Sequence, residues 1–270
     1  RTSDALHAMV AEDPSLVLEH NAALNEIVLR GMGELHLRTV LEEILDRYNL
    51  EVQTALPSIA YRETITAPAE GHHRHKKQTG GAGQFGEVYL RVAPLPPGSG
   101  FEFTSEVVGG AIPSQYIPAV ETGVKQAMDS GTSYGYPMQD IKVTVYDGKH
   151  HSVDSKEIAF VQAGKKAFLD AVEKARPIVM EPIVDVTFTI PADCAGGVTG
   201  DLSSMRGMVT GTEILPDTRM VVHGQAPLKE IQGYHSRVKS LTGGDGSFTM
   251  DFSHYAEVPR EALDQVAAQN

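Results

Sequence analysis

The sequence predicts an α+β protein of three domains, because runs with the two-residue period of strands alternate with runs that have the 3.6-residue period of helices. A linker at residues 66–71, which contains proline and glycine, and a new strand pattern that begins at Glu181 divide the chain. The expected domains are residues 1–65, 66–181 and 182–257, followed by a closing helix over 258–270 that packs back on the middle domain. A chain of 270 residues is long enough to build these separate cores.

The first domain combines two helices with short strands. Its expected elements are a helix over 2–10, a hairpin of strands over 15–19 and 26–30, a helix over 34–48, and extended runs over 50–53 and 59–64. This order matches a ferredoxin-like unit that lacks its first strand. The chain is therefore expected to begin inside a domain.

The middle domain opens with a basic stretch that turns glycine-rich. Its expected elements are strands over 87–92 and 101–107, a helix over 112–129, a strand over 141–146 and a helix over 158–175.

The third domain has a regular alternation of strands and helices. The expected order is a strand over 183–190, a helix over 191–206, strands over 207–215 and 219–227, a helix over 228–241 and a strand over 247–252. This βαββαβ order predicts a second, complete ferredoxin-like unit.

Charge is distributed unevenly along a chain whose net charge is −12. Residues 1–65 carry 5 basic and 11 acidic groups (−6), residues 66–181 carry 12 and 13 (−1), and residues 182–270 carry 6 and 11 (−5). The middle domain is therefore the part best suited to contact a polyanion. The absence of a membrane-length apolar run and of a signal-peptide pattern predicts a cytoplasmic monomer with no membrane partner.

The stretch Asp147–Ser155 is expected to form a loop between a strand and a helix of the middle domain. It carries Lys149, His150, His151 and Ser152, and a loop on a rigid scaffold is where side chains that contact a partner are commonly placed. The alternative interpretation is an exposed polar connection without a partner. Asp154 is expected to cap the helix that follows.

A second stretch of the middle domain is basic and then rich in glycine. Arg74, Lys76 and Lys77 form a basic cluster, and four glycines lie from Gly80 to Gly86. Glycine lets the backbone bend freely and lets its N–H groups approach a phosphate or a base. Because these glycines precede a strand and not a helix, a phosphate-binding enzyme loop is a weaker interpretation.

Short motifs recur in order along the whole chain. They are Arg30–Leu37 (RGMGELHL), Tyr61–Ile65 (YRETI), Gln78–Gly81 (QTGG), Gly83–Gly86 (GQFG), His151 with Val153–Ser155, Gly200–Leu202, Arg206–Gly207 and Gly246–Met250 (GSFTM). Together they resemble the C-terminal half of bacterial elongation factor G, and several ordered motifs are far more specific than a single signature.

The resemblance implies the third, fourth and fifth domains of that factor, the fourth being a ribosomal-protein-like α+β arm. The GTP-binding domain is expected upstream, and no Walker A pattern occurs in these 270 residues. The fragment is therefore not expected to be an enzyme or to need a cofactor, whereas GTP and Mg are expected in the full-length GTPase.

The resemblance also implies how the arm works, since in the family it enters the small-subunit decoding region and holds tRNA and mRNA during translocation. The expected partner is the ribosome, including its rRNA. The residues that correspond to the two tip loops are Lys149, His150, His151 and Ser152 in one, and Gly80, Gly81, Gly83 and Gln84 in the other. Imidazole and amide groups suit contacts with the hydroxyls and phosphates of A-form RNA.

The last domain of the family lies near the large-subunit region that activates GTP hydrolysis, and this chain departs from the pattern there. The family commonly has a run of arginines after Gly-Asp-Leu, whereas here only Arg206 can contact large-subunit RNA. This departure and the histidine-rich segment Gly71–Lys77 favour an elongation factor G-like paralogue over the housekeeping translocase.

Other functions remain open from the sequence. One alternative is ribosome recycling, or ribosome protection of the kind that removes tetracycline. Another is an enzymatic or metal-binding module that reuses these folds. His72, His73 and His75 offer nitrogen ligands, but no cysteine or spaced carboxylate completes a site, so no metal is expected.

Overall fold

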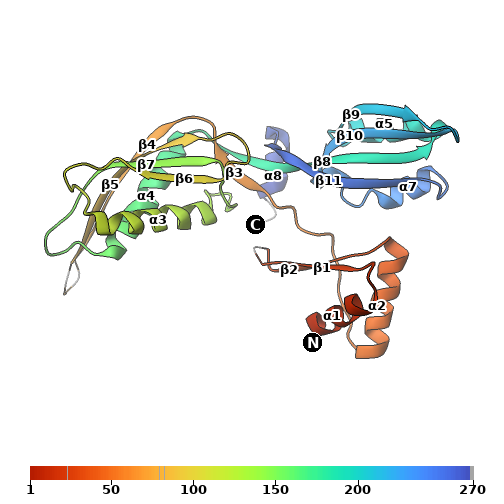
Figure 1. Cartoon of the computed structure of the whole chain (residues 1–270), viewed down its shortest axis with the longest axis horizontal. Helices are drawn as coiled ribbons and strands as arrows, with labels where there is room; N and C mark the ends of the chain where they lie inside the picture. The colour runs from red at the N-terminus through yellow and green to blue at the C-terminus, as the bar shows by residue number, and fades with distance from the viewer. Residues whose placement is uncertain (23, 79, 82, 268–270) are drawn as a thin grey trace. The chain divides into compact units, whose positions relative to one another are not determined.

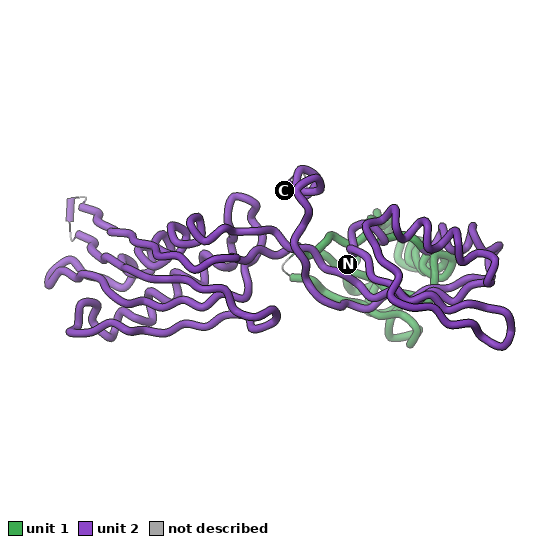
Figure 2. The backbone as a smooth tube through the Cα atoms, turned by 90° about the horizontal axis from the view of Figure 1, so that it is seen from above, with its two compact units in different colours: residues 1–60, 232–234 green, residues 61–231, 235–270 purple. Residues whose placement is uncertain are grey.

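The computed structural model describes residues 1–267 except Ala23, Thr79 and Ala82. The α+β class is confirmed (Figure 1). Two compact units divide the chain: unit 1 is residues 1–60 with 232–234, and unit 2 is residues 61–231 with 235–270 (Figure 2). The last three positions of the closing helix predicted over 258–270 lie outside the described residues. No helix in the described part of the chain combines the length and the apolar character needed to cross a membrane.

Unit 1 is a small layer of two helices and one hairpin. Its elements are α1 (Thr2–Glu12), β1 (Val17–Asn21), β2 (Glu26–Arg30) and α2 (Glu34–Tyr48). The apolar faces of the helices meet the hairpin in a core of Ala5, Leu6, Met9, Leu16, Val40 and Ile44. The helical spacing in the sequence therefore predicted α2 with its observed bounds.

His36 closes the start of α2 in unit 1. Its Nδ1 accepts a hydrogen bond from the Met32 N–H at 3.1 Å, and its Nε2 lies 2.8 Å from the Asp13 carboxylate. With Nδ1 accepting, the ring proton sits on Nε2 and is donated to Asp13. The imidazole thus joins the start of α2 to the segment that follows α1.

One strand prediction for the first domain is wrong, and a second predicted strand lies in the other unit. Residues 50–53 form no strand, and the run predicted over 59–64 is a strand, β3 (Arg62–Ile65), that pairs with β8 (Pro177–Pro191) in unit 2. The apolar residues Ile59, Tyr61 and Ile65 correctly predicted an extended segment. They do not indicate with which strand this segment pairs. The compact units divide after Ala60, whereas the sequence places the domain boundary at residue 65, which stays a prediction.

The arm of unit 2 is a four-stranded sheet with two helices on one face (Figure 1). Its elements are β4 (Ala69–Lys77), β5 (Gln84–Pro94), β6 (Phe101–Ser105), the 3₁₀ turn η1 (Ser114–Tyr116), α3 (Ile117–Ser130), β7 (Ile141–Lys149) and α4 (Glu157–Lys174). The strand order is β4-β5-β7-β6, antiparallel except for the parallel pair β6–β7. The core between sheet and helices contains Val88, Leu90, Val143, Val145, Phe160 and Phe168.

Two segments of the arm are more regular than the sequence predicts. The linker predicted over 66–71 and the basic stretch after it contain β4, which pairs along its whole length with β5. Strand β7 continues to Lys149, three residues beyond its predicted end, because Gly148 pairs opposite Val88. A side chain at Gly148 would lie 2.3 Å from the Glu87 carbonyl oxygen, so only glycine fits this position.

The last part of unit 2 is a sheet with the strand order β11-β8-β10-β9, and β3 adds to β8. Its elements are β8, the 3₁₀ turn η2 (Ala192–Cys194), α5 (Ala195–Ser204), β9 (Met208–Ile214), β10 (Arg219–Pro227), α6 (Leu228–Ile231), α7 (His235–Leu241) and β11 (Ser247–Glu257). All pairs are antiparallel, which confirms the βαββαβ prediction. The helix predicted over 228–241 is two helices, because Gly233 has a φ of +81° and breaks the run.

The closing helix α8 (Arg260–Ala267) follows β11. The Tyr136 hydroxyl, from the segment between α3 and β7, donates a hydrogen bond of 3.0 Å to the carbonyl of Val266. This contact supports the prediction that the helix packs back on the arm.

Candidate nucleic-acid interface

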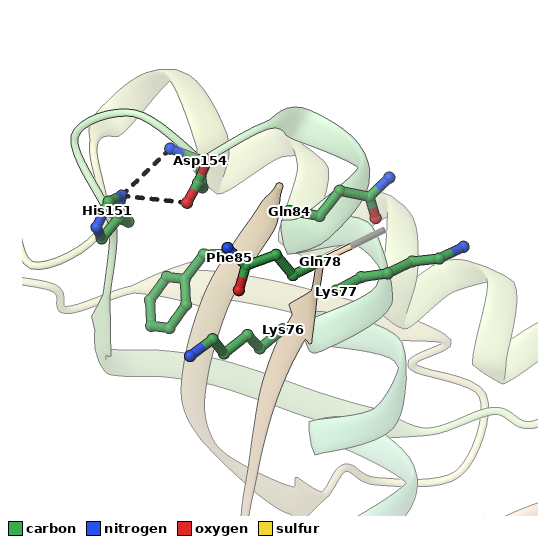
Figure 3. A pocket seen from close by; sticks show the side chains of 7 residues that line it. All are labelled: Lys76, Lys77, Gln78, Gln84, Phe85, His151 and Asp154. Carbon is green, nitrogen blue, oxygen red and sulfur yellow. Dashed lines mark hydrogen bonds and ion pairs between the residues drawn. The ribbon is translucent and has the colours of Figure 1, made fainter. Parts of the chain in front are cut away.

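The structure brings the two stretches singled out in the sequence together at one end of the arm sheet. The Phe85 N–H donates a hydrogen bond of 2.9 Å to the carbonyl of Asp154, and Phe85 and Ser155 form an isolated parallel bridge. A cavity of about 250 Å³ lies where they meet (Figure 3). It is lined by Lys76, Lys77, Gln78, Gln84, Phe85, His151 and Asp154, and these residues with their loop neighbours are called the arm tip below.

His151 lies at the arm tip with half of its side chain exposed. Its Nδ1 accepts hydrogen bonds from the N–H groups of Val153 and Asp154, both at 3.3 Å. An Nδ1 that accepts places the proton of the neutral ring on Nε2, and no described residue accepts a hydrogen bond from Nε2. The neutral ring therefore offers one N–H donor to an external group.

The Asp154 carboxylate lies beside His151 and has a different role from the one the sequence suggests. Its Oδ2 is 3.7 Å from His151 Nδ1 (Figure 3). The sequence predicts that Asp154 caps α4, but the N-cap of that helix is Lys156 and no side chain caps it. The prediction of a cap is wrong because the turn after His151 ends two residues before the helix begins.

The four glycines of the tip divide into two kinds. Gly80, with φ +46°, and Gly81 are exposed, as expected of residues that contact a partner. Gly83 is buried, and a Cβ there would lie 2.9 Å from Cγ of Asp154. Gly86 is also buried, with the backbone of Ala159 3.2 Å from its Cβ position. Because Gly83 has no side chain, the two tip segments can approach each other. The sequence predicts a contact with a partner for Gly83 and not this packing role.

The remaining residues predicted for the first tip loop lie on both sides of His151. Lys149 is exposed at the end of β7 opposite Glu87, and Ser152 is exposed in the turn. His150 Nδ1 lies 3.3 Å from the carbonyl oxygen of Ala111. In the second loop, the amide oxygen of Gln84 lies 2.9 Å from Nε2 of His75. These contacts hold His150 and Gln84 in place but leave Lys149 and Ser152 open to a partner.

The basic cluster is divided by the partners of its side chains, because Arg74 is paired within the described structure and the two lysines are not. Arg74 donates two hydrogen bonds to Glu87, from Nε at 3.1 Å and from Nη2 at 3.3 Å. His72 Nε2 lies 2.7 Å from the same carboxylate, and the Tyr89 hydroxyl donates to it at 3.3 Å. Lys76 and Lys77 are exposed and form no ion pair within the described ranges. Of the basic cluster, only these two lysines are therefore available to neutralise phosphate.

Glu87 is a buried carboxylate whose charge is fully used inside the arm, since 1% of its side chain is exposed. Burial raises its pKa, but the hydrogen bonds from His72 and Arg74 outweigh burial and hold the pKa below its usual value of 4.5. Ionised Glu87 therefore stabilises the fold above the pKa of the unfolded chain, and this stabilisation is lost as the pH falls through the folded pKa.

Replacing Glu87 with glutamine is expected to lower the free energy of unfolding by about 2 kcal/mol at pH 7. The loss should shrink as the pH falls from 7 toward 3, because protonation of the wild-type carboxyl increases in this direction. Urea titrations at the two pH values measure this difference. Glu106→Gln removes an exposed ion pair with Arg91 and should change stability by at most about 0.5 kcal/mol at either pH. An equal loss at both pH values for Glu87→Gln would contradict the prediction.

The histidines of β4 do not converge. His72 faces Glu87, whereas His73 and His75 lie at the alternate positions of the strand and point to its other side. Burial, with the neighbouring Lys166 charge, lowers the pKa of His73. No cluster of three potential metal ligands occurs among the residues with described positions. The strand geometry thus separates the nitrogen ligands that are adjacent in the sequence.

Arg206 lies far along the chain from the arm tip, after α5, with a φ of +56°. Its guanidinium donates to both oxygens of the buried Glu181, at 2.6 and 3.1 Å, and to Glu230 at 3.2 Å. The hydrogen bonds with Glu181 raise the pKa of Arg206 further. These ion pairs compete with the contact to large-subunit RNA that the sequence suggests, and that contact stays a prediction.

Four residues of the arm tip lie in the sequence motifs but were not predicted as site residues. Phe85 and Gln78 line the cavity, and Asp154 and Ser155 hold the His151 turn. Phe85 lies on β5, which begins at Gln84. The sequence predicts this strand to begin only at residue 87. An aromatic residue next to Gly86 in a glycine-rich segment was the available signal.

Comparisons with known proteins cover the whole chain. Residues 1–56 match the family model "Elongation Factor G, domain III", residues 57–176 match "Elongation factor G, domain IV", and residues 178–266 match "Elongation factor G C-terminus". A crystal structure of a protein from Thermus thermophilus is similar at 41% sequence identity with a TM-score of 0.87. That match covers 100% of this chain and 41% of the other, so the chain spans about two-fifths of the length of this relative.

Proposed function

Because this chain belongs to the elongation factor G family, we propose that it is the ribosome-contacting half of a translation factor whose arm tip enters the small-subunit decoding region. There the tip contacts the tRNA–mRNA duplex and promotes its movement. The matched domains do not include the GTP-binding domain, and GTP hydrolysis is assigned to the full-length protein. The proposal includes a cytoplasmic, monomeric protein.

One observation carries the proposal. The arm tip combines an outward N–H donor on His151, two lysines without ion pairs in the described structure, and exposed glycine backbone. RNA in the A form offers 2′-hydroxyl and phosphate oxygens, all of which accept hydrogen bonds. A site of donors and positive charges on a well-packed sheet suits such a partner, and it requires no proton transfer from His151.

Replacing His151 with alanine in the full-length protein is expected to slow messenger movement about tenfold, the equivalent of one lost charge-assisted or bridging hydrogen bond. GTP hydrolysis on the ribosome should stay within twofold of wild type. Rapid mixing with ribosomes primed for translocation, with separate signals for mRNA movement and phosphate release, measures both rates.

The matched control is His7→Ala, which removes an exposed histidine whose described hydrogen bonds are with Ser3 in its own helix. It should leave both rates unchanged. Wild-type mRNA movement in His151→Ala would remove the proposed role of the arm tip.

A second candidate function is that of an elongation factor G-like paralogue acting in recycling or ribosome protection. The observation that favours it is the engagement of Arg206, the only arginine from 203 to 206, by Glu181 and Glu230. Hydrolysis stimulated by ribosomes without a codon-sized mRNA shift in the wild-type protein would favour this function over translocation.

A further inference from the structure

We propose that Ser155 is a positioning residue that ties the two segments of the arm tip together and thereby aims His151 at its partner. The inference rests on the proposed function, because it concerns how the tip presents its contacts. Ser155 follows the His151 turn directly and faces the start of β5.

The Ser155 hydroxyl bridges the two segments with a single atom. It accepts a hydrogen bond of 2.8 Å from the His151 N–H and donates one of 3.1 Å to the carbonyl of Phe85. The oxygen of a hydroxyl group can accept one hydrogen bond and donate another. Alanine at this position therefore removes both hydrogen bonds at once. The Phe85 carbonyl and the His151 N–H would then both lose the hydroxyl as a hydrogen-bond partner.

Backbone contacts on either side of the hydroxyl complete the connection. The Ser155 N–H donates to the His151 carbonyl at 3.1 Å, and the Phe85 N–H donates to the Asp154 carbonyl at 2.9 Å. The Tyr116 hydroxyl donates to the Ser155 carbonyl at 3.0 Å, which links the turn to the segment before α3. Ser155 is thus the point where β5, the His151 turn and the start of α3 meet.

The turn that Ser155 closes fixes which edge of His151 is exposed. With the backbone of residues 151–155 held, the N–H groups of Val153 and Asp154 both reach His151 Nδ1. The ring then presents Nε2–H outward. The same turn leaves Val153, between His151 and Asp154 in the sequence, 77% exposed. Loss of the hydroxyl frees the turn, so the ring no longer has a single donor direction.

The variants that test this inference are Ser155→Ala, His151→Ala and the double variant, each made in the full-length protein. Ser155→Ala should slow mRNA movement about tenfold while GTP hydrolysis stays unchanged. In the His151→Ala background the same change should slow movement by less than twofold further, because Ser155 acts through His151.

The control is Ser130→Ala, which removes a hydroxyl that donates to the Gln126 carbonyl at 3.0 Å in α3. It should not alter mRNA movement. If Ser155→Ala moves mRNA at the wild-type rate while His151→Ala is slow, the inference fails and the proposed function stands. Full additivity of the two substitutions also overturns the inference, because Ser155 would then act independently of His151.

A readout independent of ribosomes separates failure of the inference from failure of the proposed function. Amide hydrogen exchange in peptides covering residues 149–156 and 84–90 should become about tenfold faster in Ser155→Ala. Exchange in β7 residues 141–146 should be unchanged. If His151→Ala leaves mRNA movement intact, the proposed function falls. Unchanged exchange at the tip in Ser155→Ala overturns the positioning role whatever the translocation result.

Discussion

Replacing Gly123 with alanine is expected to lower the free energy of unfolding of the arm by about 3 kcal/mol or more. A Cβ at this position in α3 would lie 2.0 Å from the Val161 carbonyl oxygen and 2.9 Å from the Lys165 nitrogen of α4. Both are backbone atoms, which cannot rotate away. The helix-propensity gain of about 1 kcal/mol for alanine over glycine is too small to offset the separation of two packed helices.

The reciprocal contact shows why this crossing is unusually close. A Cβ at Gly164 of α4 would lie 2.7 Å from the Val120 carbonyl oxygen of α3, so each helix places a glycine against the other's backbone. Urea unfolding followed by circular dichroism measures the loss. Gly196→Ala is the control, because a Cβ there meets no atom within 4 Å, and it should be neutral or slightly stabilising. A Gly123→Ala variant as stable as wild type would show that the helices separate without cost.

Replacing Arg206 with alanine is expected to destabilise the last sheet by about 3–5 kcal/mol. Glu181, on β8, is 2% exposed and receives two hydrogen bonds from Arg206, so the substitution leaves a buried carboxylate without its main partner. The alanine also keeps the left-handed φ of +56°, so no backbone strain is relieved. The midpoint of urea unfolding, compared with wild type at neutral pH, gives the size of the loss.

Two further variants separate the buried charge from general loss of an arginine. Arg219→Ala removes a guanidinium from an exposed pair with Asp217 and should cost less than about 1 kcal/mol. Glu181→Met combined with Arg206→Met removes both charges and should cost less than Arg206→Ala alone. If the double variant is the less stable one, the cost comes from lost packing and not from the unpaired carboxylate.

The sequence predicts an element well where one apolar face decides it. Helix α2 has the predicted bounds because its apolar residues repeat with the helical period along the whole element. Strand β4 gives no such signal. Its inward side packs on α4 through Gly71, whose Cβ position is 2.1 Å from the Ala167 carbonyl oxygen, and the rest of the strand is polar. In the sequence, a strand without alternating apolar residues cannot be distinguished from a linker.

The tip motifs could be found in the sequence, but their internal contacts could not. Family resemblance places His151 and Gly83 in two loops, yet only coordinates show that Gly83 is a spacer for Asp154 and that Ser155 bridges the loops. Likewise, Arg206 is a lone arginine in the sequence, and its pairing with Glu181 depends on a separation of 25 residues. Side-chain partners that are brought together by tertiary packing produce no periodic pattern in the sequence.

The pairing of Arg74 with Glu87 determines the distance over which the arm tip attracts an anion. Once that pair is neutral, the tip retains the positive charges of Lys76, Lys77 and Lys149 beside the carboxylate of Asp154, while the whole chain carries −12. Screening at physiological ionic strength limits the field of these surface lysines to about 8 Å. The same screening weakens the field of the acidic groups at longer distance, so the tip attracts an anion only within that short range. The lysines of the tip are therefore suited to hold an anion that is already close and not to draw one in from a distance.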